Sequence, residues 1–343
     1  MLIIAAAIAI WTIGAVMRTE QRARWLMIGL LLILAIAVQL VLPDGHPLRN
    51  ATGSSAGLWL IVIGVGAVVW LYARGLRALK ARHASRQEIP RKGTFSDAEL
   101  NRYARHIVLR EVGGPGQKAL KAASVLVVGA GGLGAPALQY LAAAGVGTIG
   151  VIDDDIVENA NLQRQVIHKD AAIGTPKVFS AQAEMQAQNP FVTVKPYHRR
   201  LTDDIAAELV AEYDIVLDGT DNFETRYRVN AAAVAAGVPL ISGALSQWEG
   251  QLSVFDPARG APCYRCIFPT APAPELAPSC AEAGVVGPLP GVVGAMMAME
   301  TIKLITGAGT PLRGQMVIYD ALYGESRTIA IERRAACETC ADV

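Results

Sequence analysis

The segment Ser124-Val-Leu-Val-Val128, followed directly by Gly129-Ala-Gly-Gly-Leu-Gly134, decides the fold of this 343-residue chain. The short apolar run predicts a buried strand, and the glycines, spaced as G-x-G-x-x-G, predict a tight turn into a helix that continues to Ala144. A second strand at Thr148–Asp153 completes a β-α-β unit. Glycines in such a turn let backbone amides approach a phosphate at the helix N-terminus, so the turn is a candidate nucleotide site.

The same alternation of short strands and amphipathic helices continues from Phe95 to the C-terminus. It predicts an α/β fold with a Rossmann-like, mostly parallel sheet and helices on both faces. Thr175 and Pro176 predict a helix start with the threonine as N-cap, and Gly237 predicts a helix end. Further strands are expected at Val192–Tyr197, Asp214–Asp218, Pro239–Ser242, Gly250–Phe255, Gln315–Tyr319 and Arg327–Ile331.

The N-terminal part of the chain has a different composition. Hydrophobic residues make up 52% of the sequence and charged residues 18%, and the apolar excess is concentrated before residue 80. Met1–Met17, Leu26–Leu42 and Leu58–Ala73 are close to the roughly 17 to 20 apolar residues that cross a bilayer core. We therefore predict about three transmembrane helices in a membrane anchor at 1–80, a basic linker at 81–94 and a globular domain at 95–343. A cleaved signal peptide is disfavoured for the first stretch, because it has no basic n-region and a second apolar stretch follows it.

Basic residues predict the orientation of this anchor. Arg18, Arg22 and Arg24 separate the first two apolar stretches, and seven basic residues follow the third: Arg74, Arg77, Lys80, Arg82, Arg86, Arg91 and Lys92. Because positive loops stay in the cytoplasm, we expect a multi-pass protein of a bacterial inner membrane, with its N-terminus outside and its globular domain in the cytoplasm. The net charge of +1 gives no reason to expect nucleic acid as a partner.

Charged residues that follow the predicted strands indicate the ligand. Asp153 ends the second strand, where a carboxylate accepts hydrogen bonds from a ribose. Asp153 and the glycines Gly129, Gly131 and Gly134 fit the cofactor site of a nicotinamide-dependent oxidoreductase as well as they fit an ATP site. Arg164 and Lys177 change this balance, because they bring two positive charges to the same edge of the sheet, which suits a triphosphate better than a dinucleotide.

Asp221 follows another predicted strand, in the segment Asp218-Gly-Thr-Asp-Asn222. Magnesium in proteins prefers one or two carboxylates together with phosphate oxygens and water, so Asp221 is a candidate Mg²⁺ ligand. The alternative is that Asp221 is only the N-cap of a helix that begins at Phe223.

Five cysteines lie in the C-terminal part of the sequence. Two Cys-x-x-Cys pairs, Cys263 with Cys266 and Cys337 with Cys340, supply the four thiolates of a closed tetrahedral zinc site. The roughly seventy residues between the pairs leave a redox-active pair as an alternative. Cys280 is the odd thiol, and it is either a small loop residue or a reactive one, depending on its exposure.

Several motifs, in this order along about 95–343, are similar to those of the ThiF/MoeB/HesA family, the molybdopterin-synthase and thiamine-biosynthesis adenylyltransferases of the ubiquitin-activating superfamily. The motifs are Arg102-Tyr-Ala-Arg105, Ile107-Val-Leu-Arg110, the Gly129–Gly134 loop, Asn161-Leu-Gln-Arg-Gln165, Gly174-Thr-Pro-Lys177, Thr220-Asp-Asn222, Cys263-Tyr-Arg-Cys266 and the segment from Cys280 to Pro288.

The resemblance implies ATP-dependent adenylation of the C-terminal glycine carboxylate of a small ubiquitin-like (β-grasp) sulfur-carrier protein that ends in Gly-Gly. Pyrophosphate is released, and the product is ready for sulfur transfer. ATP, Mg²⁺ and Zn²⁺ are the implied cofactors. To the nucleotide site the resemblance adds Gly132, Asn161, Gln163 and Asn222. It also implies a homodimer in which Arg105 reaches the partner subunit's site, and a Cys280 segment that crosses the active site.

Three features depart from the family pattern. They are the membrane anchor, the glycine at position 219, where relatives often have a small or thiol residue, and the absence of a sulfurtransferase domain after Cys340. We therefore expect the sulfur donor to be a separate protein. Two further alternatives remain within the same architecture. In the first alternative, the carboxylate that the enzyme activates belongs to a peptide or a tRNA-linked intermediate. In the second, the fold has lost catalysis and serves as a scaffold.

Overall fold

The computed structural model describes residues 2–17, 19, 21–43 and 45–53, scattered positions between 57 and 75, and residues 95–272 and 283–343. The chain divides into two compact units, Met1–Ile89 and Pro90–Val343. Each unit is described separately below.

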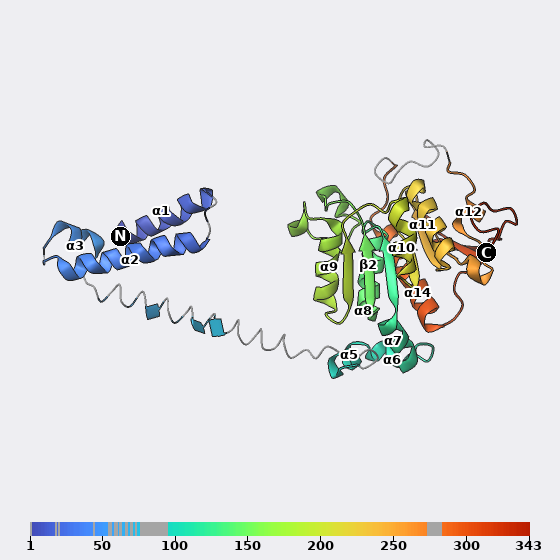
Figure 1. The fold of residues 1–343 in the computed structure, drawn as a ribbon, viewed down its shortest axis with the longest axis horizontal. Coiled ribbons are helices and arrows are strands. Elements are labelled where there is room, and N and C mark those ends of the chain that lie inside the picture. The colour runs from blue at the N-terminus through green and yellow to red at the C-terminus, as the bar shows by residue number, and fades with distance from the viewer. Residues whose placement is uncertain are drawn as a thin grey trace. The chain divides into compact units, whose positions relative to one another are not determined.

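The N-terminal unit contains a helical hairpin. Helices α1 (Leu2–Val16) and α2 (Gln21–Val41) pack against each other, and the short α3 (Pro47–Thr52) follows them (Figure 1). The apolar part of α2, Ala23–Val41, has the length and composition to cross a membrane and is only 11% buried, whereas the apolar part of α1, Ala5–Val16, is shorter. The third predicted stretch lies largely outside the described residues. The hairpin thus exposes apolar side chains along α2.

The C-terminal unit is built on an eight-stranded sheet with the strand order β3-β2-β1-β4-β5-β6-β7-β8. Its strands are β1 (Ser124–Val128), β2 (Thr148–Ile152), β3 (Thr193–Tyr197), β4 (Ile215–Asp218), β5 (Leu240–Leu245), β6 (Glu249–Phe255), β7 (Gln315–Asp320) and β8 (Glu325–Ala330). Each strand predicted from the sequence is present, although β5 continues three residues beyond its predicted end.

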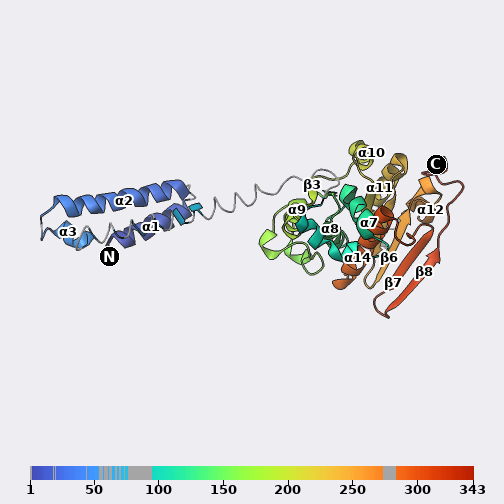
Figure 2. The same ribbon diagram turned by 90° about the horizontal axis from the view of Figure 1, so that it is seen from below.

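The sheet is parallel over β1 to β5 and antiparallel from β5 to β8. The change of direction has a local cause. Strands β5 and β6, and likewise β7 and β8, are joined by turns of a few residues, and such short connections permit only antiparallel pairing. Figure 2 shows β6, β7 and β8 side by side at one end of this unit.

Helices cover both faces of the sheet, as the sequence predicts. The helices α7 (Gly113–Ala122), α8 (Gly134–Ala144), α9 (Lys177–Gln188) and α14 (Pro288–Thr306) share one apolar core with Val125 and Val127 of β1. On the opposite face, α10 (Asp203–Ala211) and α11 (Phe223–Ala236) share a second core with Leu126 and Val128. Because β1 is buried on both faces, its sequence is continuously apolar and does not alternate.

The helix α14 also has the length and apolar composition of a membrane span, but it belongs to this core, where 44% of its apolar window is buried. The remaining short helices are α5 (Asp97–Arg102), α6 (Ala104–Ile107) and α12 (Tyr264–Ile267), with single 3₁₀ turns at Asn159–Asn161, Asp170–Ala172 and Pro257–Arg259.

Two helix boundaries test the capping signals. Gly237 ends α11 in the left-handed conformation, with φ of 65°, which confirms the predicted helix end. The predicted N-cap at Thr175 is wrong: α9 begins at Lys177 with Pro176 at the N-cap and without a side-chain cap. The carbonyl of Thr175 instead accepts a hydrogen bond from the amide of Val157, and Pro176 forms a bridge with Ile156. A tertiary pairing therefore overrides the local capping preference.

Candidate active site

The candidate site lies where the strand order of the sheet reverses. Strands β1 and β4 are neighbours, with Val128 opposite Asp218, and the chain leaves them toward opposite faces of the sheet. In open α/β sheets this switch point creates a crevice at the carboxyl ends of the strands. The loops that follow β1 and β4 line a cavity of about 1220 Å³ at this position.

The glycine loop after β1 requires glycine at two positions. Gly129 has a φ of 93°, and a Cβ there would lie 3.2 Å from the carbonyl oxygen of Gly219 in the loop after β4. A Cβ on Gly134 would lie 1.9 Å from the carbonyl oxygen of Gly129. The loop is therefore packed against both its own helix and the neighbouring loop, whereas Gly131 and Gly132 face the cavity.

Asp153 supports this loop from the end of β2. One of its carboxylate oxygens accepts a hydrogen bond from the amide of Ala130, at 2.7 Å, and the other accepts one from the amide of Asp155, at 2.8 Å. Each carboxylate oxygen has a further lone pair, and Asp153 lines the cavity. Its orientation is therefore fixed before any ribose hydroxyl binds.

Two cations, Lys177 and Arg164, also line the cavity. The Nζ of Lys177, at the start of α9, lies 2.7 Å from a carboxylate oxygen of Asp155, and its side chain is only 6% exposed. The Arg164 guanidinium donates to the side-chain oxygen of Asn161, at 3.1 Å, and to the carbonyl of Ala160, at 3.2 Å. The structure therefore brings both predicted phosphate-binding side chains to one cavity and holds each in place with a neighbouring oxygen.

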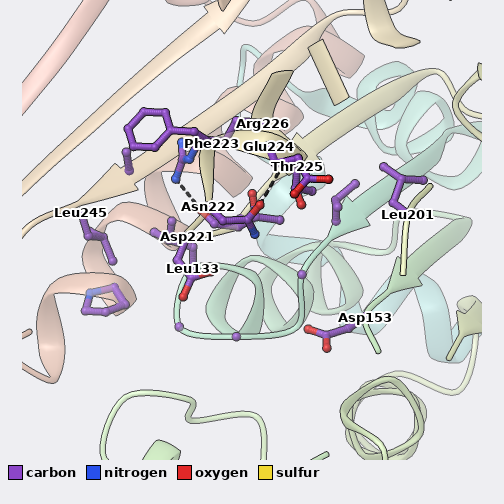
Figure 3. Close-up of a pocket in the computed structure, with 18 of the residues that line it drawn as sticks. Leu133, Asp153, Leu201, Asp221, Asn222, Phe223, Glu224, Thr225, Arg226 and Leu245 are labelled. Carbon is purple, nitrogen blue, oxygen red and sulfur yellow. Dashed lines mark hydrogen bonds between the residues drawn. The ribbon is translucent and has the colours of Figure 1, made fainter. Parts of the chain in front are cut away.

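Asp221 is exposed on the loop after β4, at the start of α11. The N-cap of this helix is Asn222, whose side-chain oxygen accepts a hydrogen bond from the amide of Thr225 at 2.9 Å. The alternative that Asp221 is the helix N-cap is therefore wrong. Figure 3 shows Asp221, Asn222 and Arg226 together on one side of the cavity, with Asp153 on another.

A buried ion pair beneath this loop was not anticipated from the sequence. Asp218 and Arg226 are 0% and 5% exposed. Asp218 accepts hydrogen bonds from the backbone and side chain of Thr220, at 3.0 and 2.6 Å, and from the hydroxyl of Ser242, at 3.2 Å. Arg226 donates to the carbonyl of Thr220, and one of its nitrogens lies 3.9 Å from Asp218. The signal in the sequence was an arginine four residues after the N-cap, on the first turn of α11.

His168 also supports the glycine loop and Gln165 lines the cavity beside it, although the sequence pattern gave neither a role of its own. The imidazole of His168 bridges the carbonyl of Ala130 and the hydroxyl of Ser180, both at 2.9 Å. Burial lowers the pKa of His168, which favours a neutral ring that donates to the carbonyl. Gln165 is 4% exposed and lines the cavity, and its carboxamide oxygen is buried without a hydrogen-bond partner among the described residues.

These observations fit a magnesium nucleoside triphosphate. Backbone amides of a glycine loop and two cations suit phosphate oxygens, and an exposed aspartate in the same cavity lining suits Mg²⁺. Because a buried polar atom without a partner costs free energy, the carboxamide of Gln165 indicates that a ligand or its water completes the site. The remaining lone pairs of the Asp153 carboxylate can accept hydrogen bonds from ribose hydroxyls.

Other residues named from the sequence lie outside the cavity lining. Gly134 packs behind the loop, and Asn161 acts on Arg164. The side-chain oxygen of Gln163 is directed at Gly287, where a Cβ would lie only 2.7 Å away. Arg105 is exposed on α6. Cys280 lies outside the described residues.

The four paired cysteines meet in one buried cluster. The Sγ of Cys263 lies 3.8 Å from that of Cys266 and 3.6 Å from that of Cys337, and Cys266 lies 3.5 Å from Cys340. All four thiols are free. Four sulfurs around one zinc ion at about 2.3 Å are separated by about 3.8 Å. The cluster thus has the ligand type and spacing of a closed zinc site, and disulfide-bonded sulfurs, at about 2.05 Å, would lie much closer together.

The fold and the site together define an α/β nucleotide-binding protein with its ligand cavity at the sheet's switch point. The ThiF family model matches residues 103–339, and the chain belongs to this family. It is 51% identical over 252 residues to the sulfur carrier protein adenylyltransferase of Thermus thermophilus, covering 72% of this chain and 93% of the relative. It is 47% identical over 244 residues to the SAMP-activating enzyme E1 of Haloferax volcanii, covering 71% and 90%.

The chain is therefore an ATP-dependent adenylyltransferase, which decides against the nicotinamide-dependent alternative. Another relative, the adenylyltransferase and sulfurtransferase MOCS3 of Bos taurus, is 46% identical over 263 residues, which cover 76% of this chain and 58% of that one. Among solved structures, E. coli MccB with ATP matches with a TM-score of 0.62 at 25% identity, covering 71% of this chain and 75% of that chain. This match agrees with the Rossmann-like fold.

Proposed function

We propose that the chain adenylates the C-terminal glycine carboxylate of a small ubiquitin-like sulfur-carrier protein. The observation that carries the proposal is the 51% identity to a sulfur carrier protein adenylyltransferase over 93% of that enzyme's length. The convergence of Arg164, Lys177 and Asp221 on one cavity with the glycine loop supports it. The adenylate is the species that a sulfur donor would consume.

In the proposed reaction, a carboxylate oxygen of the carrier attacks the α-phosphorus of ATP. A new P–O bond forms, the bond between the α-phosphorus and the bridging oxygen breaks, and pyrophosphate leaves with that electron pair. No general base is needed, because the carboxylate is already ionised at neutral pH. Catalysis then depends on positioning and on neutralising charge.

Each side chain has a defined part in this scheme. Arg164 and Lys177 bind the phosphates and stabilise the charge that develops on pyrophosphate. Asp153 orients the ribose, and the amides of the glycine loop receive the phosphates. Asp221 holds Mg²⁺, which neutralises phosphate charge when it is bound.

Apolar side chains of the cavity suit the tail of the carrier. Leu245, Phe268 and Val285 are among the lining residues, and Leu245 lies on the far side of the Asp221–Arg226 segment from Leu201 (Figure 3). An extended chain that ends in two glycines is narrow enough to pass between such walls, and its backbone can lie close to them.

Homodimerisation is part of the proposal. Arg105 is exposed on α6, and Val108 and Leu109 beside it are 74% and 48% exposed. We propose that this surface contacts a second copy of the chain and that Arg105 of one copy reaches the nucleotide cavity of the other. Mixing an Arg105→Ala chain with a Lys177→Met chain tests this. Two individually inactive variants that recover activity on co-expression support a shared site, and no recovery in a demonstrated mixed dimer contradicts it.

We also propose that Cys263, Cys266, Cys337 and Cys340 hold one structural Zn²⁺. Thiolates are the ligands that select zinc in closed sites, and all four positions are filled by protein. When bound, the ion contributes folding free energy to the C-terminal part of the domain.

The N-terminal unit is proposed to be a membrane anchor in a bacterial inner membrane, with the adenylyltransferase domain in the cytoplasm. Arg24 lies over the ring of Trp11, 5.6 Å from its centroid, and Trp11 and Trp25 pack edge to face at 5.1 Å. Tryptophan and arginine at one end of an apolar hairpin are typical of a cytoplasmic membrane interface. A phosphatase fused after Val343 should be inactive, and periplasmic activity of this fusion would refute the orientation.

The reaction itself is tested by ATP–pyrophosphate exchange. Each small protein of the source organism that ends in Gly-Gly is purified and added to the full-length enzyme with Mg·ATP and labelled pyrophosphate. One carrier should support exchange, and its variant without the final glycine should not. If exchange proceeds only with a peptide or with charged tRNA, the chemistry stands and the proposed substrate is wrong.

A further inference from the structure

The segment 198–201, which follows β3, contributes three side chains to the nucleotide cavity. Arg199, Arg200 and Leu201 line the cavity together with Asp153. Figure 3 shows Leu201 and Asp153 on the same side of the Asp221–Arg226 segment. The strand β3 is the neighbour of β2, and β2 is the neighbour of β1. All three are parallel, so their ends lie side by side at one edge of the sheet, about 4.8 Å apart.

This order of strands also orders the parts of a bound nucleotide. The glycine loop after β1 suits phosphates, and Asp153 at the end of β2 suits the ribose. In ATP the ribose lies between the phosphates and the adenine base. A nucleotide that follows the same order continues from the ribose toward the end of β3. The base therefore reaches the segment 198–201.

Hydrogen bonds join this segment to the loop after β2. The carbonyl of Tyr197 accepts a hydrogen bond from the amide of Asp153 at 3.2 Å. The imidazole of His198 donates to the carbonyl of Asp154 at 3.2 Å, and the guanidinium of Arg200 donates to the carboxylate of Asp154, also at 3.2 Å. The segment is therefore fixed beside the proposed ribose ligand.

The helix α11 holds the same segment from another direction. Arg228 of this helix donates to the carbonyl of Leu201 at 3.2 Å. The guanidinium of Arg228 is itself held by carboxylates of Asp203, at 2.6 Å, and Glu224, at 2.9 Å. A wall held by two neighbouring elements is in place before the ligand binds, which lowers the cost of binding.

Arg199 differs from the other residues of this segment. Its backbone amide donates to the carbonyl of Tyr197 at 2.9 Å, but its exposed side chain forms no hydrogen bond or ion pair within the described part of the chain. A hydrogen bond with Thr202 and, to a smaller extent, the charge of Arg199 lower the pKa of the exposed Asp204. The Arg199 guanidinium is thus available to a ligand in the cavity.

We propose that Arg199 binds the adenine base of ATP by stacking its guanidinium on a face of the ring, beside the apolar side chain of Leu201. The guanidinium group is planar and weakly hydrated, and it stacks readily on aromatic faces. The inference rests on the proposed role of Asp153 in holding the ribose. Stacking uses the face of the base and not its edge, so Arg199 contributes affinity for purine nucleotides without distinguishing adenine from a related purine.

The test uses Arg199→Ala in the full-length protein. Calorimetry measures the binding of AMP, of IMP, whose base differs from adenine at the ring edge, and of tripolyphosphate with Mg²⁺. The affinities for AMP and IMP should both fall roughly two- to tenfold, the range of a cation–π contact at an exposed site. The affinity for tripolyphosphate should not change, because this ligand has no base. The thermal unfolding temperature should also stay at the wild-type value, since the side chain is exposed.

Two further variants separate stacking from charge. Arg199→Lys keeps the positive charge but has no planar group, so it should lose most of the same affinity for AMP. Lys195→Ala is the matched control. It removes a positive charge from β3 that pairs with Glu212 at 3.5 Å and does not line the cavity. All three affinities should stay at the wild-type value in this control.

Several results would overturn the inference. Wild-type affinity for AMP in Arg199→Ala, or in Arg199→Lys, would show that no stacking contact is lost. A weaker affinity for tripolyphosphate would assign Arg199 to the phosphates, and unequal losses for AMP and IMP would assign it to the edge of the base. These measurements need no carrier. If the wild type binds AMP but no carrier supports exchange, the proposed substrate fails and the inference is still decided by the three affinities.

Discussion

Replacing Lys177 with methionine should remove most ATP–pyrophosphate exchange. The change deletes the positive charge and keeps a chain of similar length in a position that is 6% exposed. A unit charge about 4 Å from a phosphate oxygen contributes about 4 kcal/mol at an effective dielectric constant of about 20. Asp155, 2.7 Å from the same ammonium, competes with the phosphate for this charge. We therefore expect a net loss of about 2 to 4 kcal/mol, which is a roughly 30- to 1000-fold slower exchange.

The same variant should fold normally. Asp155 is 67% exposed at its side chain, so loss of Lys177 leaves a carboxylate that water solvates, at a cost below about 1 kcal/mol. Thermal unfolding checks this, and steady-state analysis of exchange separates kcat from KM for ATP. Exchange within about threefold of wild type by a folded Lys177→Met enzyme would refute the proposed role of the lysine.

Asp155→Asn is the matched control for this prediction. It removes the competing carboxylate and leaves the lysine in place. We expect its KM for ATP to be equal to or lower than that of the wild type, because the ammonium is then free to bind phosphate. A large loss of exchange in Asp155→Asn would mean that the ion pair, and not the lysine charge alone, is required.

Four further predictions concern other parts of the chain. Asp221→Ala should abolish most exchange and its Mg²⁺ dependence, and near-normal exchange contradicts the mechanism. Cys280→Ala should still form the adenylate, because the carboxylate attacks phosphorus without a thiol, and a folded variant without exchange disproves this. Cys266→Ser should lower zinc from about one ion per chain and lower the melting temperature, as elemental analysis and calorimetry will show. Burial acts to raise the pKa of Glu99, but the hydrogen bond from Lys121 and those from Ser96 outweigh it and leave the pKa below the ordinary value. A carboxylate whose pKa is lowered by folding stabilises the fold at pH values above its unfolded-state pKa, and this stabilisation is lost as the pH falls through its folded-state pKa. Glu99→Gln should therefore be less stable than wild type at neutral pH but not at about pH 3. Urea unfolding at the two pH values measures this difference.

The local elements were predictable because their signals are local. The apolar run Ser124–Val128 indicated a buried strand, and the glycine spacing after it indicated a tight turn into α8. Gly237 indicated the end of α11 for the same reason, since only a left-handed residue without a Cβ fits there without strain. The four cysteines were also visible as a ligand set, because two Cys-x-x-Cys pairs are a strong pattern by themselves.

The arrangement of the site depended on contacts between distant residues. Gly129 touches Gly219, ninety positions away, only because β1 and β4 are neighbours. Thr175 was expected to cap α9, but pairing with Val157 places its carbonyl elsewhere. Spacing along the chain carries no information about either contact.

The sequence by itself determined the strands, the helices between them, the nucleotide loop and the kinds of side chain that both candidate sites contain. Only the tertiary structure decided that Asp155 pairs with Lys177, that Arg226 donates to the carbonyl of Thr220 in the loop before Asp221, and that the four cysteines meet in one buried cluster. The physical reason is that secondary structure follows from a few adjacent residues, whereas an ion pair between residues far apart in the sequence forms only where the order of strands in the sheet brings their loops together. That order is set by burial of the whole core.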